Sequence, residues 1–340
     1  MVSSICGLLR PLGAKPKNRS APSLRQQSRQ DSNQATGSTP FSQNVALLQS
    51  NGYYLHREAD WHSRSIAKAS SEDGCVVALK YLTRTRNSFE LEILRHLKQQ
   101  LDCNNHVIVL ISAIAIADIA DADPRGDIIV MLSLWPLEVI LQKSPHTTQT
   151  MQTQFLEAVS FLHHHKVAHL DLKPGNALID IKPSPRLSLI DFGLSIFVQN
   201  ENTEVLGYRG TLTWSAPEVG TVDGLRLKFK AILADWWSCG KVLQFITQHE
   251  GRCSALEFDH GCAQLLRSDL QARPPLEDIL KLLQSQTSLT KPMAKHSSSI
   301  ERQFVLKWLH SERCVSLSLT RIQPHVLYKA EWTKHDLIPL

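Results

Sequence analysis

HLDLKPGN at residues 169–176, followed fifteen residues later by DFG at residues 191–193, is the most informative part of this sequence. Asn176 and Asp191 carry side-chain oxygens, which are the ligands that Mg2+ prefers. Asp171 is suited to orient a hydroxyl for in-line attack, and Lys173 is suited to lie against a transferring phosphoryl group. The four residues have the order and spacing that phosphoryl transfer from ATP requires.

These two motifs resemble the catalytic loop and the Asp-Phe-Gly signature of the eukaryotic protein kinase superfamily. The resemblance implies an α+β, bilobal fold with a small strand-rich N-lobe containing one helix and a larger helical C-lobe. It implies ATP and Mg2+ as cofactors and a protein as substrate, with Asp171 and Lys173 catalytic and Asn176 and Asp191 binding the metal. Lysine at position 173 is similar to the Ser/Thr branch, so transfer to Ser/Thr hydroxyls is expected.

The nucleotide site of the family has matching residues in the first half of the chain. Lys80, in VALK at 77–80, matches the strand lysine that binds the α- and β-phosphates. Glu90 is its favoured partner because Leu94 follows on the same helical face, whereas Glu92 points roughly 200° away. The interval is short for the family, so pairing through Glu92, or no pair, is the alternative. Ala78 and Leu178 match the residues that sandwich adenine, and Met131 matches the gatekeeper ahead of hinge residues 132–134; all three also suit ordinary core packing.

Other matching residues support the site in the family. His169 and Phe192, with Gly193 beside them, are expected to pack between the lobes. Thr211 is expected to bridge the catalytic aspartate and lysine. Asp235, in DWWSCG at 235–240, is expected to anchor the backbone of the catalytic loop from a buried helix.

GTLTWSAPE at residues 210–218 resembles the end of the activation segment in this family. Its Glu218 is expected to pair with Arg273, a buried pair whose loss costs roughly 3–5 kcal/mol. The segment also favours a peptide substrate over a small molecule. The chain from Asp235 to Arg273 is short for the family, so a reduced substrate-side helix is expected.

Two departures from the family pattern bear on function. The three glycines of the nucleotide-covering loop fall near Ala59, Trp61 and Arg64, and none of these is glycine. Because glycine lets backbone amides approach phosphates at positive φ, a pseudokinase scaffold with weak or no catalysis is the alternative function. Trp61 is a candidate to fill the phosphate space. Leu170 replaces the arginine that normally binds an activation-loop phosphate, so phosphorylation of that loop is not expected to be the main switch.

The chain divides into three parts by composition and pattern. Residues 1–45 are polar and basic, which predicts a disordered leader, and this composition also fits a mitochondrial transit peptide. Residues 46–288 are the predicted kinase-like domain, with an N-lobe over 46–134 and a C-lobe over 135–288. Residues 289–340 form a tail with no predicted role. An intracellular location, cytoplasmic or nuclear, is the favoured expectation.

Hydrophobic periodicity predicts the main elements of this domain. Strands are expected over 75–82, 107–116 and 127–134. Helices are expected over 151–163 and 231–246, the second apolar on all sides and therefore buried. The N-lobe helix is predicted to begin at Asn87 or Ser88 and to bury a stripe formed by Phe89, Ile93, Leu94 and Leu97.

Composition excludes several other classes. The net charge of +5 is mild and no basic stripe with interleaved aromatics occurs, so nucleic acid is not expected as a partner. No apolar run is long enough to span a bilayer, so no membrane association is expected. The seven cysteines are scattered without a C-x-x-C pair, which indicates free thiols. His163, His164 and His165 are adjacent on a helix and cannot converge on one metal ion, so they are expected to form its polar end. The oligomeric state is not predicted.

Overall fold

The structure is a computed structural model that describes residues 39–83, 88–100, 102, 104–116, 126–182, 184–220, 228–249 and 256–289. Residues 1–38 form one unit of the chain and residues 39–340 the other, and the described residues all belong to the second. Most of the predicted leader, and the predicted tail from residue 290 onward, lie outside the described residues.

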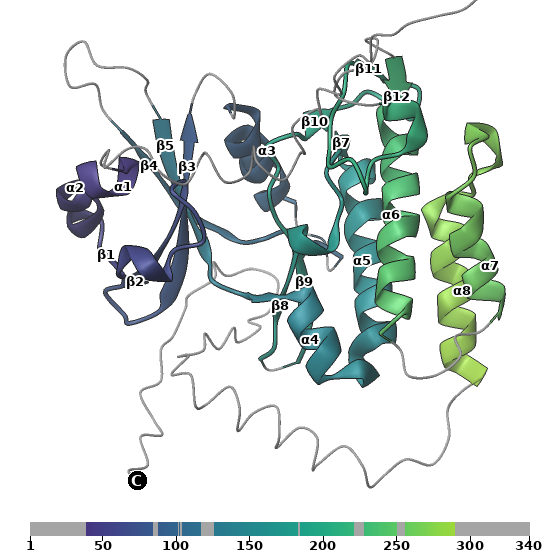
Figure 1. Ribbon diagram of the computed structural model, residues 1–340, viewed down its shortest axis with the longest axis horizontal. Coiled ribbons are helices and arrows are strands. Elements are labelled where there is room, and N and C mark those ends of the chain that lie inside the picture. Colours follow the sequence, from purple (N-terminus) through teal and green to yellow (C-terminus); the bar gives the residue numbers. More distant parts are fainter. Residues whose placement is uncertain are drawn as a thin grey trace, which may run out of the picture. The chain divides into compact units, whose positions relative to one another are not determined.

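The N-terminal part of the second unit is built on an antiparallel sheet (Figure 1). Its strands are β1 (Tyr53–Leu55), β2 (Ile66–Ser71), β3 (Val76–Thr83), β4 (Leu110–Ala115) and β5 (Gly126–Leu132). They lie in the order β1-β2-β3-β5-β4, so β3 is central and pairs with both β2 and β5. Gly74 takes a φ of 79° in the turn between β2 and β3, a conformation that favours glycine.

Strand alternation gives this sheet two different faces. Val77 and Leu79 of β3 point to one face, which two short helices cover: α1 (Pro40–Gln43) and α2 (Val45–Ser50). Phe41 of α1 and Leu48 of α2 are fully buried against this face. Lys80 directly follows Leu79 and therefore points to the opposite face. Packed structure therefore begins before residue 46, where the sequence places the start of the domain.

The helix on the Lys80 side is α3 (Ser88–Lys98). Ile93, Leu94 and Leu97 of its predicted apolar stripe are buried. Phe89 is not part of that stripe, because 58% of its surface is exposed. The sequence prediction was wrong here because Phe89 lies in the first turn of α3, at the edge of the packed face of the helix, where a side chain can point into solvent. The predicted cap Asn87 lies outside the described residues.

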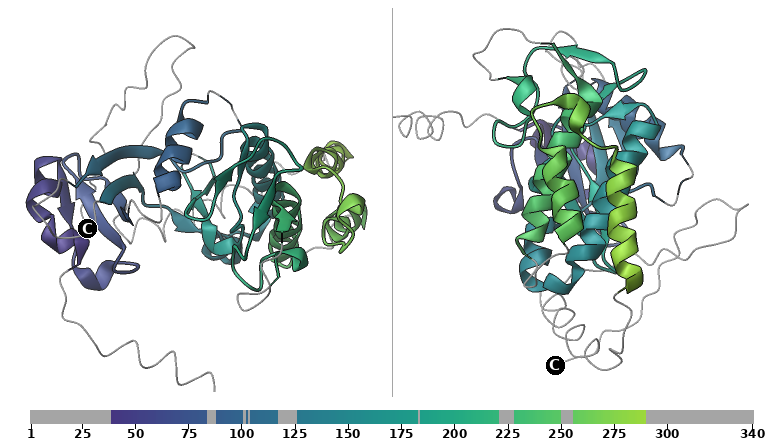
Figure 2. Two further views of the ribbon diagram at one scale, coloured as in Figure 1. Left: turned by 90° about the horizontal axis from the view of Figure 1, so that it is seen from above. Right: turned by 90° about the vertical axis from the view of Figure 1, so that its right-hand side faces the viewer.

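The C-terminal part is mainly helical, as predicted. Its α-helices are α4 (Leu137–Lys143), α5 (Thr148–His164), α6 (Ala231–Thr247), α7 (Leu256–Leu265) and α8 (Leu276–Leu289). Helices α5 to α8 pack beside one another, with α5 and α7 each lying against both α6 and α8, and α6 is buried on several sides (Figure 1, Figure 2). Residues 248–255 separate α6 from α7, in line with the short interval between Asp235 and Arg273.

Short strands and 3-10 turns connect these helices and frame the catalytic loop. The strands are β6 (Trp135–Pro136), β7 (Val167–Ala168), β8 (Ala177–Asp180), β9 (Arg186–Leu189), β10 (Ile196–Phe197), β11 (Glu204–Leu206) and β12 (Lys228–Lys230). The turns are η3 (Pro145–Thr147), η4 (Pro174–Asn176), η5 (Pro217–Val219) and η6 (Leu270–Ala272), while η2 (Glu58–Asp60) lies between β1 and β2 in the N-terminal part. The catalytic loop follows β7, and the DFG residues follow β9, so both motifs meet beside the hairpin of β8 and β9.

This arrangement confirms the predicted α+β class with a strand-rich N-lobe and a helical C-lobe. Within the described residues, none of the helices has the length and apolarity needed to cross a membrane. Cys75, Cys239 and Cys262 are buried free thiols, in line with the expectation for these three cysteines.

Candidate active site

Lys80 stands at the centre of the charged site between the lobes. Its Nζ lies 2.7 and 2.9 Å from the two carboxylate oxygens of Glu90 on α3 and 2.7 Å from Oδ1 of Asp191. The predicted ion pair with Glu90 is therefore present. Glu92 is exposed and takes no part, since two residues of helix turn it away from β3. Asp191 joins the N-lobe lysine to the C-lobe.

Lys80 and Asp191 each favour the charged form of the other. Burial alone lowers the pKa of Lys80, but Glu90 and then Asp191 outweigh burial and leave that pKa above its ordinary value. Burial raises the pKa of Asp191, yet the Lys80 ammonium outweighs it and holds the pKa of Asp191 below its ordinary value. Both groups are therefore charged at neutral pH. Asp191 keeps 43% of its side chain exposed, so solvent and ligands can reach this carboxylate.

The catalytic loop brings its predicted residues together. Lys173 Nζ donates to Asp171 Oδ2 at 2.7 Å and to Thr211 Oγ1 at 2.9 Å. Thr211 in turn donates to Asp171 Oδ1 at 2.7 Å, which is the bridge that the sequence predicts. Asn176 Nδ2 donates to Asp171 at both its backbone oxygen, 2.8 Å, and its Oδ2, 3.0 Å. Three side chains, Lys173, Thr211 and Asn176, thus fix the orientation of the Asp171 carboxylate.

Asp235 holds the backbone of this loop from α6. Its buried carboxylate accepts the backbone N–H of His169 at 2.7 Å and of Leu170 at 2.8 Å. These bonds support Leu170 at a φ of 61°, a left-handed conformation that costs a residue with a side chain roughly 1–3 kcal/mol. The anchoring contact expected of Asp235 is therefore present.

His163 also reaches Asp235, which the sequence reasoning missed. Its Nε2 lies 3.0 Å from Asp235 Oδ2, so this histidine is more than the polar end of α5. A signal for this contact is the short interval in the sequence: His163, in α5, lies six residues before His169 of the catalytic loop, whose backbone Asp235 also binds. His165 instead packs its ring 4.4 Å from that of Phe161.

His169 and Phe192 pack against each other as expected, with ring centroids 5.0 Å apart. Both are fully buried. Burial lowers the pKa of His169, so its ring is neutral at pH 7. The neutral ring donates from Nε2 to the Ile190 carbonyl at 3.1 Å and accepts the Asp171 N–H at Nδ1 at 3.3 Å. His169 therefore ties the catalytic loop to the DFG segment.

Gly193 allows two carboxylates to approach the DFG turn. A Cβ at this position would lie 3.3 Å from Asp191 Oδ1 and 3.5 Å from Glu90 Oε2. The Phe192 N–H also donates to Glu90 Oε1 at 3.3 Å. A side chain at position 193 would thus crowd the cluster around Lys80.

The three residues matched to the adenine site lie on two sheets. Ala78 and Met131 are cross-strand partners in β3 and β5 and share the sheet face of Lys80. Leu178 lies in β8, where it pairs with Pro136 beside the link between the lobes. Met131 is buried, while Ala78 and Leu178 are partly exposed. These positions fit an adenine-binding role.

Trp61 does not fill the phosphate space, which corrects the sequence hypothesis. The ring packs on the sheet face opposite Lys80, edge-on to Phe41 with centroids 5.5 Å apart. Its Nε1 donates to the His56 carbonyl at 3.1 Å. The reason is Phe41, which the sequence placed in a disordered leader and which instead offers an apolar surface to the indole.

Glu218 and Arg273 form the predicted pair beneath the activation segment. Arg273 donates from Nη1 at 2.6 Å and from Nη2 at 2.9 Å to the two oxygens of Glu218. It also donates to the carbonyls of Leu233 and Arg267. All guanidinium nitrogens are thus used in a buried setting.

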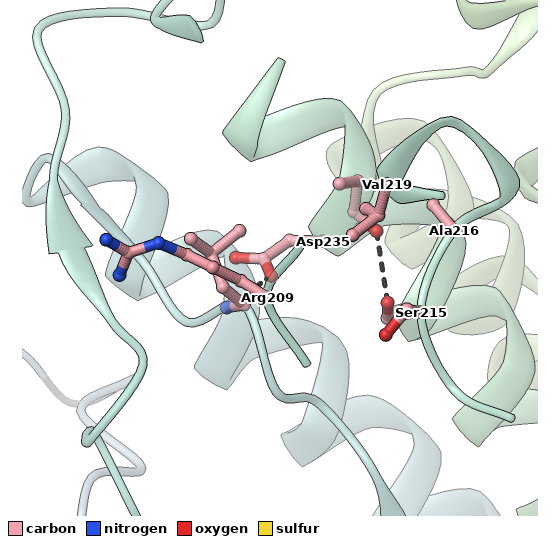
Figure 3. Close-up of a pocket in the computed structure, with 8 residues that line it drawn as sticks. Arg209, Ser215, Ala216, Val219 and Asp235 are labelled. Carbon is pink, nitrogen blue, oxygen red and sulfur yellow. Dashed lines mark hydrogen bonds between the residues drawn. The ribbon is translucent and has the colours of Figure 1, made fainter. Parts of the chain in front are cut away.

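A small hollow lies near this pair, lined by Arg209, Ser215 and Asp235 among others (Figure 3). Its volume of about 10 Å³ is room for one water molecule. Arg209 directs its guanidinium away from Asp235 in Figure 3 and donates to the Leu194 carbonyl at 3.1 Å. The hollow is too small for a substrate or a nucleotide.

Asn176 and Asp191 fit a magnesium ion by the chemistry of their donors. Asn176 uses its Nδ2 toward Asp171, which directs its Oδ1 away from that contact. Its backbone carbonyl accepts the N–H of Ile190 at 3.0 Å, so Asn176 lies beside the segment that leads from β9 to Asp191. An amide oxygen and an exposed carboxylate are ligands that Mg2+ takes in proteins, together with waters and phosphate oxygens.

Comparison with known proteins agrees with this geometry. The protein kinase domain model matches residues 63–326. The chain is 39% identical over 99 residues to serine/threonine-protein kinase 17A of Oryctolagus cuniculus, covering 29% of this chain and 23% of that protein. It is 30% identical over 188 residues to CBL-interacting protein kinase 21 of Oryza sativa, covering 55% and 30%. It is 33% identical over 127 residues to death-associated protein kinase 2 of Homo sapiens, covering 35% and 33%.

The fold, the site and the match over most of the chain define its class: the chain belongs to the protein kinase domain family. The relatives named above are similar to it over a third or less of their own length. The matched region also extends past residue 288, where the sequence analysis ends the domain.

Proposed function

We propose that this protein is an ATP- and Mg2+-dependent protein serine/threonine kinase. The observation that carries the proposal is the closed set of contacts among Asp171, Lys173 and Thr211, all between 2.7 and 2.9 Å. This set holds a carboxylate and an ammonium where a hydroxyl acceptor and a phosphoryl group would meet. The names of the relatives, serine/threonine-protein kinase 17A among them, support the same activity.

Each residue has a distinct task in this proposal. Lys80, kept charged by Glu90, binds the α- and β-phosphates of ATP. Asp171 orients the Ser/Thr hydroxyl and accepts its proton late, while Lys173 neutralises charge on the transferring group. Asn176 and Asp191 would hold Mg2+, which when bound offsets the negative charge of the phosphates.

The remaining matched positions hold these groups in place. Asp235, with His163, fixes the loop backbone, and His169 with Phe192 joins the loop to the DFG segment. The catalytic gain comes mainly from positioning and from charges that need no rearrangement during transfer. The substrate is proposed to be a protein, because Thr211 belongs to the stretch that resembles the activation segment. In the family, that segment shapes a peptide-binding surface.

A pseudokinase scaffold is the second candidate function. It is favoured by one observation: the loop over residues 56–65 contains no glycine, and its Trp61 is turned to the far side of the sheet. A nucleotide bound here would lack the backbone amides that a glycine-rich loop supplies. Against this candidate stands the set of Lys80, Asp171, Asn176 and Asp191, in which every residue type that transfer needs is present.

The test is γ-phosphate transfer by the purified full chain. Labelled MgATP or MnATP is supplied with a basic acceptor protein, and the labelled residues are identified as phosphoserine, phosphothreonine or phosphotyrosine. The proposal expects label on serine or threonine that is lost in both Lys80→Ala and Asp191→Ala. Glu90→Gln is expected to lose label too, and Glu92→Gln is its matched control with label retained, since of these two glutamates only Glu90 touches Lys80. Nucleotide binding without transfer by the unaltered chain would favour the scaffold.

A further inference from the structure

The loop between β1 and β2 has two parts, which lie at different places on the sheet. Its middle, which contains η2 and Trp61, is held on the sheet face opposite Lys80 by the contact with Phe41. Its end forms a tight turn in which Ser63 and Ile66 exchange two backbone hydrogen bonds of 3.3 Å. The turn is therefore the part of this loop that remains beside the nucleotide face.

The strand register places this turn next to Lys80. Ile66, its last residue, is the cross-strand partner of Lys80. Ser65 extends the ladder by one step, since its carbonyl accepts the N–H of Tyr81 at 2.9 Å. Arg64 forms the tip of the turn, and it is exposed. An arginine thus stands at the end of the strand that flanks the proposed phosphate-binding lysine.

The charge of the site calls for a further cation. Two cations, Lys80 and Lys173, face three carboxylates, Glu90, Asp171 and Asp191, all within ion-pair distance of one lysine or the other. These side chains leave one net negative charge, and the proposed Mg2+ then has to offset this charge as well as the charges of the phosphates. A guanidinium at the edge of the site would offset the repulsion between the carboxylates and the phosphates. Its planar fork of N–H donors also matches phosphate oxygens in a way that an ammonium does not.

We propose that Arg64 binds the phosphates of the nucleotide from the tip of this turn, in place of the backbone amides of a glycine-rich loop. The inference rests on the proposed function, because it assumes that a nucleoside triphosphate is the ligand of the Lys80 site. A side-chain contact needs no positive φ and no close backbone approach. The absence of glycine from the loop is then compatible with tight binding of a triphosphate.

The test is calorimetric titration of the full chain with MgATP and with adenosine, which lacks phosphates. Arg64→Ala is expected to bind MgATP about tenfold more weakly and adenosine unchanged, as for the loss of a charge-assisted contact. Arg64→Lys is expected to recover part of the loss. Arg57→Ala is the matched control, because it removes an exposed arginine from the other part of the same loop, directly before η2, where Arg57 pairs with Asp60 at 3.3 Å. The control is expected to bind both ligands like the unaltered chain.

Each other outcome has a definite meaning. Equal MgATP affinity in Arg64→Ala and the unaltered chain would overturn the inference and leave the proposed function standing. A parallel loss for adenosine would show that Arg64 maintains the fold rather than binding phosphate, and would also overturn it. Failure of the unaltered chain to bind MgATP would contradict the proposed function, and the inference with it.

Discussion

Removing either partner of the Glu218–Arg273 pair should destabilise the C-lobe strongly. Arg273 has no exposed side-chain surface and Glu218 has 17%, and two hydrogen bonds of 2.6 and 2.9 Å join them. Breaking such a pair leaves one charge buried without its partner, which costs roughly 3–5 kcal/mol. Arg273→Ala also leaves the Leu233 carbonyl without this donor, so its cost should lie toward the upper end.

The measurement is urea unfolding of four proteins: the unaltered chain, Glu218→Ala, Arg273→Ala and the double variant. If the two side chains stabilise each other, the double variant should lose less free energy of unfolding than the two single losses added together. Lys281→Ala removes the exposed partner of Asp278 and serves as the control, with no measurable change expected. Additive losses, or single losses below about 1 kcal/mol, would refute the reasoning.

Three further results are expected. Thr211→Val removes both contacts of this hydroxyl and should lower kcat roughly 10- to 100-fold, while Thr211→Ser restores it. Phosphatase treatment should leave activity unchanged, because Leu170 packs in an apolar cluster with Val205 of β11, which holds the segment without a phosphate; lost activity would contradict this. Burial lowers the pKa of His106 from 6.5 to about 4. Between pH 6.5 and 4 the unfolded chain therefore binds a proton that the folded chain does not, and the free energy of unfolding should fall by about 3 kcal/mol as the pH drops across this range. In urea titrations at each pH, His106→Gln should show a smaller fall.

The catalytic constellation could be predicted because its members are close in sequence or have fixed family positions. Asp171, Lys173 and Asn176 lie within six residues, so one loop conformation brings them together. The distant contacts of Lys80 with Glu90, and of Glu218 with Arg273, followed from the resemblance rather than from any local pattern. In both cases a buried charge needs a partner of opposite charge, which limits the pairings that are possible.

The contacts that could not be predicted depend on tertiary packing. Phe41 lies in a polar, basic stretch, and only the outer face of the sheet gives it a place to be buried. That same surface then draws Trp61 away from the nucleotide side. His163 depends on the relative rotation of α5 and α6, which hydrophobic periodicity does not specify to within one side chain.

The central claim is that the chain transfers phosphate despite a loop without glycine. Its most direct test is transfer from saturating MgATP to a mixture of Ser/Thr peptides by the unaltered chain and by Asp171→Asn. The account predicts that both proteins bind MgATP with equal affinity, while Asp171→Asn transfers phosphate roughly 10²- to 10⁴-fold more slowly. The claim would be contradicted if the unaltered chain bound MgATP and transferred nothing, or if both proteins transferred phosphate at the same rate.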